Sequence, residues 1–219
     1  MHQNPTDTKT LKPHLENLRE TYGEQVFQEL QDITADAGYG SEENYDYLEQ
    51  QGLTPYVKYN TFDKEQDKNY QKKHKAFSKE NLHYNQQEDY YVCPMGQKMN
   101  KTHQSKRTTE AGYTQNLSHY QAQNCEGCPL RGQCFKAKGN RSVERNHNLE
   151  KHKERARQLL LNEKGIQKRR QRTADVEPVF AQLKHNNGFR RFSLKGLKKV
   201  ELEFGLMALA HNLRKKIAA

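Results

Sequence analysis

Apolar residues recur at helical spacing near both ends of the chain. Near the start, a helix over about 8–22 that ends at Gly23 is predicted from Leu11, Leu15, Leu18 and Tyr22. Near the end, a helix over roughly 196–217 carries one apolar face formed by Leu202, Leu206, Leu209 and Leu213. A third, basic helix begins at about 148 and contains Leu159, Leu160 and Leu161.

Short apolar runs separated by turn residues follow the first helix. Residues 30–35 read as a strand that ends at Asp36, and residues 54–59 read as a second strand. Between them, glycines turn the chain and Ser41 caps a helix that stops near Gly52. This strand–helix–strand order predicts a parallel pair of strands in an α/β domain.

The middle of the chain is polar. Residues 60–90 are rich in Lys, Gln, Asn, Asp and Tyr with few aliphatic residues, which predicts a mobile or weakly ordered insert. Residues 90–135 hold all four cysteines. We therefore divide the chain into an α/β part at 1–59, an insert at 60–147 and a basic helical part at 148–219.

The segment Val176–Lys184 is the most informative for chemistry. Its apolar residues follow the i, i+3, i+4, i+7 pattern of a buried helix: Val176, Val179, Phe180 and Leu183. Glu177 and Lys184 are seven residues apart, nearly two helical turns, so an ideal helix places both on one face. This arrangement suits an acid that binds a metal beside a base that holds a phosphate.

Charge is distributed unevenly along the chain. Residues 1–135 carry 15 Lys and Arg against 19 Asp and Glu, a net of −4, whereas residues 136–219 carry 22 against 8, a net of +14. A surplus of this size predicts a polyanion partner, most often nucleic acid, over the alternative of a solvated basic helix. The sequence has no apolar run that could span a bilayer and no signal peptide pattern, so we expect a cytoplasmic, nucleoid-associated protein without a membrane partner.

Asp36 is the second candidate acid. It lies at the carboxyl end of a predicted strand, where ligands and catalytic groups gather in α/β sheets. Each acid also has an ordinary structural interpretation. Asp36 resembles a common turn aspartate, and Glu177 resembles a glutamate favoured by the dipole at a helix N-terminus.

The two acids and their neighbours together resemble the DDE transposases of bacterial insertion sequences, in the group with a cysteine-rich insert between these acids. The resemblance covers nearly the whole chain and rests on these segments: Asn4-Pro5-Thr6-Asp7, Ala35-Asp36-Ala37-Gly38-Tyr39, Ser41-Glu42-Glu43-Asn44-Tyr45, Val176-Glu177-Pro178-Val179-Phe180 and Lys184-His185-Asn186-Asn187-Gly188-Phe189-Arg190-Arg191-Phe192. It implies a ribonuclease-H-like α/β core interrupted by the insert.

The resemblance also implies a chemistry. Asp36 and Glu177 would bind Mg²⁺ in a two-metal site that cleaves and transfers DNA strands, with transposon ends and target DNA as partners. Lys184 would contact a DNA phosphate near the cut. A basic residue precedes the family's Glu, and Arg172 is the nearest candidate here.

The family's first Asp has no counterpart on a convincing strand. Asp7 lies in a turn, and Asp32 is too close to Asp36. We therefore expect a C-terminal piece of a transposase that binds Mg²⁺ poorly and cuts DNA weakly or not at all. It would act as a homodimer or with an upstream transposase fragment. Two alternatives stay open: a non-catalytic DNA-binding remnant or partner of an intact transposase, and a small zinc-binding protein that contacts RNA.

The four cysteines have the spacing of a metal site. One C-x2-C pair plus two further thiols, Cys93, Cys125, Cys128 and Cys134, is sufficient for a tetrahedral Zn²⁺ centre. In the cytosol disulfides are disfavoured. The alternatives are four free thiols or a site that His119 completes.

Basic residues gather around the Glu177 segment and predict contacts with DNA phosphates: Arg169, Arg170, Arg172, Lys184, Arg190, Arg191, Lys195, Lys198 and Lys199. Phe189 and Phe192 lie among them. They are either groups that stack on bases or, as we favour, core residues that anchor the loop.

Overall fold

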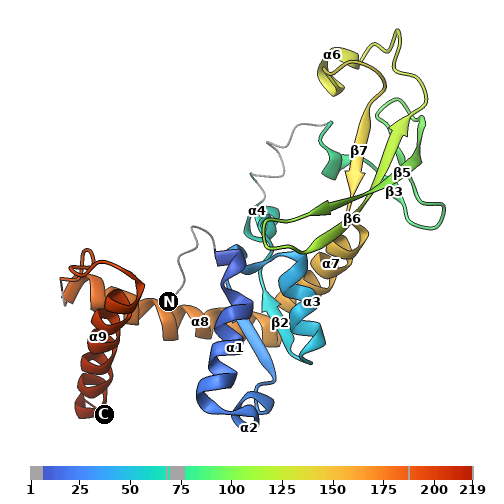
Figure 1. Cartoon of the computed structure of the whole chain (residues 1–219). Coiled ribbons are helices and arrows are strands. Elements are labelled where there is room, and N and C mark those ends of the chain that lie inside the picture. The colour runs from blue at the N-terminus through green and yellow to red at the C-terminus, as the bar shows by residue number, and fades with distance from the viewer. Residues whose placement is uncertain (1–6, 68, 70–76, 187, 219) are drawn as a thin grey trace.

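The computed structural model describes residues 7–67, 69, 77–186 and 188–218. Figure 1 shows three parts: a body of helices around a two-stranded sheet, a larger sheet beyond it, and a terminal helix that stands apart from both. Of the residues predicted to be informative, Asn4, Pro5, Thr6 and Asn187 lie outside the described ranges. Among the helices that the structure describes, none is long and apolar enough to cross a membrane.

The body contains the predicted parallel pair. Strands β1 (Asp32–Ala35) and β2 (Thr54–Val57) pair in parallel, and helix α3 (Glu42–Gln50) connects them. The Ser41 hydroxyl accepts from the Asn44 N–H at 3.2 Å, so the predicted N-cap is confirmed. The mixed α/β class is confirmed as well.

Two helices precede β1. Helix α1 (Leu11–Tyr22) ends at Gly23, whose N–H donates to the Arg19 carbonyl, and helix α2 (Glu24–Gln28) follows. Their apolar faces join one core with β2, α3 and a later helix, α7 (His147–Leu161): Leu11, Leu15, Phe27, Tyr45, Tyr47, Leu48, Leu53, Tyr56, Val57, Tyr59, Phe62, Ala156 and Leu160. The first helix thus begins three residues later than predicted, after a short 3-10 turn η1 (Asp7–Lys9).

Gly40 allows the chain to pass close to the end of β2. A Cβ atom at this position would lie 2.2 Å from the Lys58 carbonyl oxygen, far inside van der Waals contact. A side chain there would push apart the two strand ends. The turn that follows Asp36, η2 (Ala37–Tyr39), is therefore packed directly against β2.

The described residues of the polar segment 60–90, which the sequence predicts to be mobile or weakly ordered, form short elements of secondary structure. These residues form α4 (Phe62–Gln66), η3 (Lys79–Asn81), β3 (Tyr84–Asn85) and β4 (Tyr90–Val92). Phe62 is fully buried in the body, and Tyr91 is buried under the larger sheet. The segment has few aliphatic residues, and tyrosine rings supply the apolar surface that packs in the cores.

The larger sheet has five antiparallel strands in the order β3-β4-β5-β6-β7. The long hairpin β5 (Lys98–Thr108) and β6 (Thr114–Ala122) forms its centre, and β7 (Ser142–Arg145) follows the short helix α6 (Arg131–Cys134). A separate small core lies on one face, formed by Leu82, Tyr91, Met99, Tyr120, Ala122 and Val143.

Two consecutive helices return the chain to the body. Helix α7 (His147–Leu161) and helix α8 (Glu163–Ala181) meet at Asn162, whose side chain accepts from the Gly165 N–H at 2.7 Å. A Cβ atom on Gly165 would meet the Leu159 carbonyl at 1.9 Å, so the corner requires glycine. The predicted basic run and Glu177 lie in one helix, α8, which contacts β1 and β2.

Helix α8 continues into a π-helical turn, η4 (Gln182–Asn186), and a loop leads to α9 (Leu197–Ala218). Helix α9 matches the predicted last helix within one residue at each end. In Figure 1 it lies apart from the body, beyond the far end of α8.

Candidate functional site

Asp36 lies at the carboxyl end of β1 and directly precedes the η2 turn. Its side chain is 51% exposed and accepts a hydrogen bond from the Arg172 guanidinium on α8. Four residues earlier on each element, Lys168 Nζ lies 2.8 Å from Asp32 Oδ1. The basic face of α8 is therefore fixed against β1 by two ion pairs.

A cavity of about 540 Å³ opens beside Asp36. Its wall consists of the ends of β1 and β2 and of one side of α8: Thr34, Ala35, Asp36, Lys58, Ile166, Arg169, Arg170, Arg172 and Thr173. Glu177 follows Thr173 by four residues, which places it on the same side of α8, one turn farther along. Among the described residues, no hydrogen bond or ion pair joins Asp36 to Glu177.

The helix around Glu177 differs from the prediction in two ways. It is not buried, because Val176 is 36% and Phe180 49% exposed and only Leu183 is covered. Lys184 lies in a wider π-helical turn instead of an α-helical one, so the spacing of an ideal α-helix does not apply between it and Glu177. Pro178, inside α8, lacks the N–H that an uninterrupted helix would use.

A buried asparagine holds the turn that follows Asp36. Asn44 is 2% exposed, and its amide donates to the Tyr39 carbonyl at 2.8 Å and to the Thr8 carbonyl at 3.0 Å. The Thr8 hydroxyl donates to the Gly38 carbonyl at 2.9 Å. Two segments that carried the resemblance, around Asp7 and Asn44, thus meet at the Asp36 turn.

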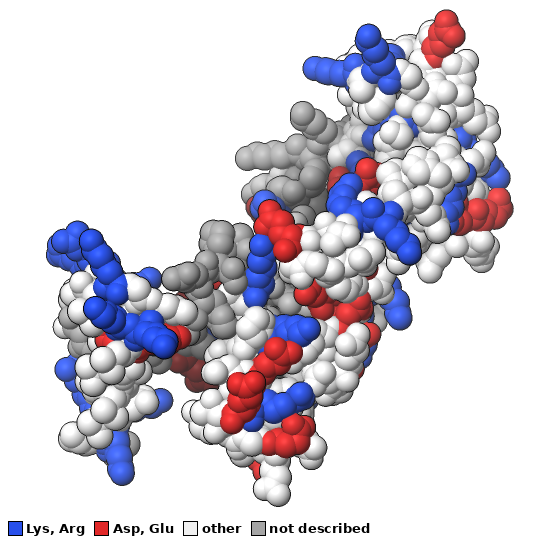
Figure 2. All heavy atoms as spheres, viewed as in Figure 1, with Lys and Arg blue, Asp and Glu red and all other residues white. Residues whose placement is uncertain are grey.

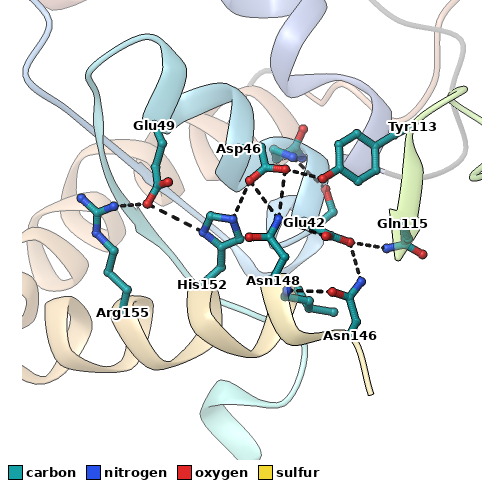
Figure 3. A network of polar contacts seen from close by, with 12 residues as sticks. Glu42, Asp46, Glu49, Tyr113, Gln115, Asn146, Asn148, His152 and Arg155 are labelled. Atoms are coloured by element: carbon teal, nitrogen blue, oxygen red, sulfur yellow. Dashed lines mark hydrogen bonds and ion pairs between the residues drawn. The ribbon is translucent and has the colours of Figure 1, made fainter. Parts of the chain in front are cut away.

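A network of polar side chains joins the body to the larger sheet (Figure 3). The buried Glu42 carboxylate accepts from Gln115 Nε2 at 2.9 Å, Asn146 Nδ2 at 2.5 Å and Asn148 Nδ2 at 3.0 Å. One turn along α3, Asp46 lies 2.7 Å from His152 Nε2 and accepts from the Tyr113 hydroxyl. The network connects α3, α7 and β6.

The Asp46 carboxylate of this network is held in the ionised form. Burial raises the pKa of Asp46, but hydrogen bonds from Tyr113, Asn148 and His152 outweigh it, and the pKa lies below its ordinary value. The pKa of Tyr113 is raised by burial and by its bond to Asp46, so its hydroxyl stays a donor. Every acid here has a protein partner, which indicates a structural junction.

The four cysteines are half-buried, and their thiols are free. Cys93 and Cys125 pack against its small core, while the Arg141 N–H donates to Cys125 Sγ at 3.3 Å and the Arg141 guanidinium to Cys134 Sγ at 2.7 Å. Within the described ranges, no group of three or more His, Cys, Asp or Glu side chains is placed to hold a metal ion. The zinc site, with or without His119, therefore stays a prediction. His119 instead contacts Ser105 Oγ at 2.7 Å.

Exposed basic side chains follow the π-helical turn. The predicted DNA-contacting residues at this end of the chain are all exposed: Lys184, Arg190, Arg191, Lys195, Lys198 and Lys199. Figure 2 shows Lys and Arg gathered over this loop and α9. Phe189 and Phe192 are half-buried and pack edge-to-face at 5.0 Å, so they brace the loop against each other.

Three of the predicted contacts to DNA lie closer to the body. Arg172 pairs with Asp36, and Arg169 stacks on the Phe62 ring at 5.3 Å. Arg170 lines the cavity next to Asp36. Sequence reasoning missed the Asn44 and Glu42 contacts. The available local signal was Asn146, a typical N-cap residue before α7, but it indicates only the helix start and not the Glu42 contact.

A comparison with protein families identifies the C-terminal part of the chain. A family model described as a transposase DDE domain matches residues 92–217, more than half of the 219 residues. The match includes Glu177, Lys184 and all four cysteines, and it begins after Asp36. No curated protein and no solved structure matches the chain.

Proposed function

Because the chain belongs to the transposase DDE domain family, we propose that it is the C-terminal part of an insertion-sequence transposase with a ribonuclease-H-like core. The family acts in DNA recombination by transposition and generally uses a divalent metal, Mg²⁺. One observation supports the proposal: Arg169, Arg170 and Arg172 of α8 line the cavity at the strand end that bears Asp36, and Glu177 follows Thr173 of that cavity by four residues on the same helix. In α/β folds, strand ends of this kind are where active sites form.

The donors present suit Mg²⁺ in kind. Asp36 and Glu177 are both accessible carboxylates, and hard cations take oxygen ligands. When bound, the metal would polarise the phosphodiester and lower the pKa of a water molecule. Arg172 is the competing group, because its guanidinium already holds an Asp36 oxygen.

The proposed reaction is a pair of in-line displacements at phosphorus. A water oxygen first attacks a phosphodiester at the transposon end and gives its proton to solvent; the bond from phosphorus to the 3′-oxygen breaks, and that oxygen takes a proton from solvent to become a 3′-hydroxyl. The hydroxyl then attacks a target phosphodiester and gives its proton to solvent, and a second 3′-oxygen leaves and is protonated by solvent. Lys184 would hold a nonbridging phosphate oxygen, and Arg170 and Arg169 would attract the strand to the cavity.

We propose that this activity is impaired in the chain itself. The acids before Asp36 are poorly placed as a third ligand, because Asp32 is at the opposite end of β1 and is bound by Lys168. Asp7 comes nearest, against Gly38, but its segment is a turn. An upstream transposase fragment would supply the missing acid, together with strands that continue the β1–β2 sheet.

DNA is the proposed partner in either case, at transposon ends and target sites in the nucleoid. A non-catalytic DNA-binding remnant, or partner of an intact transposase, is the second candidate. It is favoured by the Asp36–Arg172 pair and by the exposure of the basic loop. We also propose a structural Zn²⁺ bound by Cys93, Cys125, Cys128 and Cys134, which would hold the loop between β6 and β7 to the end of β4.

Two measurements test these proposals. Fluorescence anisotropy with a short DNA duplex gives the association constant at a series of salt concentrations. We expect the logarithm of this constant to fall linearly with the logarithm of the salt concentration. Arg190→Gln with Arg191→Gln should lower that slope by about 2, roughly 0.9 per phosphate contact. The matched control, Lys136→Gln with Lys138→Gln, changes two exposed basic residues of the insert. No binding at low salt would remove DNA as a partner.

Supercoiled plasmid with Mg²⁺ or Mn²⁺ tests the catalytic part. We expect no nicking by the chain alone. Nicking that disappears in Asp36→Ala would overturn the proposed impairment and leave the active site intact as assigned. Nicking that survives in both Asp36→Ala and Glu177→Ala would show that neither residue belongs to the site.

A further inference from the structure

The apolar face of α9 is open to solvent. Leu202, Leu206, Leu209 and Leu213 are 53–62% exposed, although they form one continuous stripe. None of the described elements packs extensively along this helix. Its first turns are steadied by the preceding loop, because the Glu203 carboxylate accepts from the Ser193 N–H at 2.9 Å and the Leu194 N–H at 3.0 Å. A stripe of this kind on a firmly capped helix is typical of an interaction surface.

The stripe is complementary to itself. Its spacings of four, three and four residues read the same in both directions along the helix. An antiparallel second copy, related by a two-fold axis, therefore places Leu202 opposite Leu213 and Leu206 opposite Leu209. This is the arrangement of an isologous contact, in which both copies use the same surface.

Small residues flank the centre of the stripe. Gly205 and Ala210 lie beside Leu206 and Leu209, and a Cβ atom added to Gly205 would meet no atom within 4 Å. Nothing within the described structure therefore requires glycine there, although glycine disfavours a helix interior. Close approach of a second helix accounts for it, as small residues do at other helix contacts.

Charge favours the antiparallel direction. Arg214, Lys215 and Lys216 lie near the end of α9, whereas near its start Glu201 and Glu203 balance Lys198 and Lys199. A parallel pair would set the three basic residues against the same three of its copy. An antiparallel pair sets them against the balanced first turns, which removes this repulsion within the roughly 10 Å over which charges act at moderate salt, and it also opposes the two helix dipoles.

We propose that α9 is a self-association surface, on which the leucine stripe pairs antiparallel with the same stripe of a second copy of this chain. Taking about 100 Å² of apolar surface per leucine side chain, the half-exposed stripes of two copies bury roughly 500 Å². Flanking side chains bring this toward the lower limit of specific interfaces, near about 1,000 Å². The dimer is therefore weak and depends on concentration.

The leucine stripe would form the contact of the proposed homodimer, and only the geometry of α9 supports this assignment. It requires neither DNA nor catalysis, so it fails or holds independently of the plasmid and anisotropy measurements. Sedimentation equilibrium of the full chain over a concentration series provides the test. We expect the mass to rise from 25.7 kDa toward twice that value.

Variants locate the contact. Leu206→Gln with Leu209→Gln should abolish dimerisation, whereas Leu161→Gln, an exposed leucine on α7, should leave it unchanged. Gly205→Gln supplies a better helix former but blocks close approach, so it should weaken the dimer at least tenfold while circular dichroism shows no loss of helix. A chain that is monomeric at every concentration overturns the proposal. A dimer that persists when both Leu206→Gln and Leu209→Gln are present overturns it too.

The direction is tested by spin labels attached through an unnatural amino acid at Lys199. An antiparallel pair separates the two labelled backbone sites by about 25 Å along the helix axis, since each residue adds about 1.5 Å. A parallel pair would bring them to about 10 Å. A short distance therefore contradicts the antiparallel arrangement.

Discussion

Replacing Glu42 by Ala should destabilise the chain far more than replacing its neighbour Glu43. The Glu42 carboxylate is 4% exposed and accepts three amide hydrogen bonds, from Gln115, Asn146 and Asn148 (Figure 3). The donors come from β6, from the residue before α7 and from α7 itself. Removal of the carboxylate therefore weakens the junction between the body and the larger sheet, where the Asp46 contacts remain.

The size of the loss in the free energy of unfolding depends on which of the three donors can form a hydrogen bond to water instead. A hydrogen bond to a charged group contributes about 1.5–3 kcal/mol, and a buried donor left unpaired costs about 1–3 kcal/mol. Asn148 is exposed and Gln115 half-buried, so water replaces much of what they lose. Asn146 is buried, so its side-chain N–H, which donates to Glu42, stays unpaired. Together these effects predict a loss of about 2–4 kcal/mol in the free energy of unfolding.

Glu43→Ala is the matched control. Both glutamates lie in the first turn of α3 and favour the helix dipole by about 0.3–1 kcal/mol each. Urea denaturation followed by circular dichroism gives both free energies, and an unchanged slope shows that the same surface is exposed. Equal losses below about 1 kcal/mol in the two variants would refute the reasoning, because Glu42 would then contribute only as a helix-terminal charge.

Three further predictions concern other parts of the chain. Burial raises the pKa of Asp89, but hydrogen bonds from Tyr120, Tyr84 and Lys101 outweigh it and lower the pKa to about 2. Asp89→Asn, which tolerates the φ of 53°, should therefore lower the urea midpoint at pH 7, and the difference from wild type should narrow only below about pH 4. Asn44→Ala should reduce stability by about 2 kcal/mol and expose the Asp7 turn to proteolysis, whereas Asn100→Ala, on the exposed face of β5, should do neither. Metal analysis under reducing conditions should find about one zinc per chain, lost in Cys128→Ser; a content near zero in the wild type contradicts the zinc site.

The α/β unit was predictable from sequence because its signals are local. Ser41 caps α3 through a residue three positions away, and Gly23 ends α1 through a carbonyl four positions back. The two strands are short, apolar and separated by a helix of ordinary length, which leaves a parallel pair as the natural solution. Errors here are limited to the ends of the elements.

The larger sheet was not predictable, because its central hairpin lacks the alternation that marks a half-buried strand. Along β5, only Met99 is buried, and the remaining residues are mostly exposed on both faces. Backbone pairing with β6 over nine residue pairs determines this structure. Polar sequences of this kind resemble loops in any argument based on side-chain periodicity.

Periodicity also identifies which residues share a helix face but not what covers that face. Periodicity predicts a buried stripe that includes Val176 and Phe180, but the structure leaves both side chains exposed. The junction of Figure 3 illustrates the same difficulty over longer range. Asn148 and Asp46 meet across 102 residues of sequence, and neither carries a local signal for the other.

The positive charge of the C-terminal part has two different roles. Lys168 and Arg172 are spaced one helical turn apart on α8, and each meets an acid of β1, so their charge is compensated within the fold. The segment 184–199 contains no Asp or Glu, and its exposed basic residues are the side chains available to a polyanion. The two roles meet at Asp36. A metal ion that binds this carboxylate must displace the Arg172 guanidinium or share the oxygen with it, and a charge-assisted hydrogen bond is among the stronger contacts of its kind.

Arg172→Ala should therefore strengthen Mn²⁺ binding at Asp36, measured by electron paramagnetic resonance. Mn²⁺ affinity that is equal in the wild type and in Arg172→Ala would show that the pair does not restrain the site.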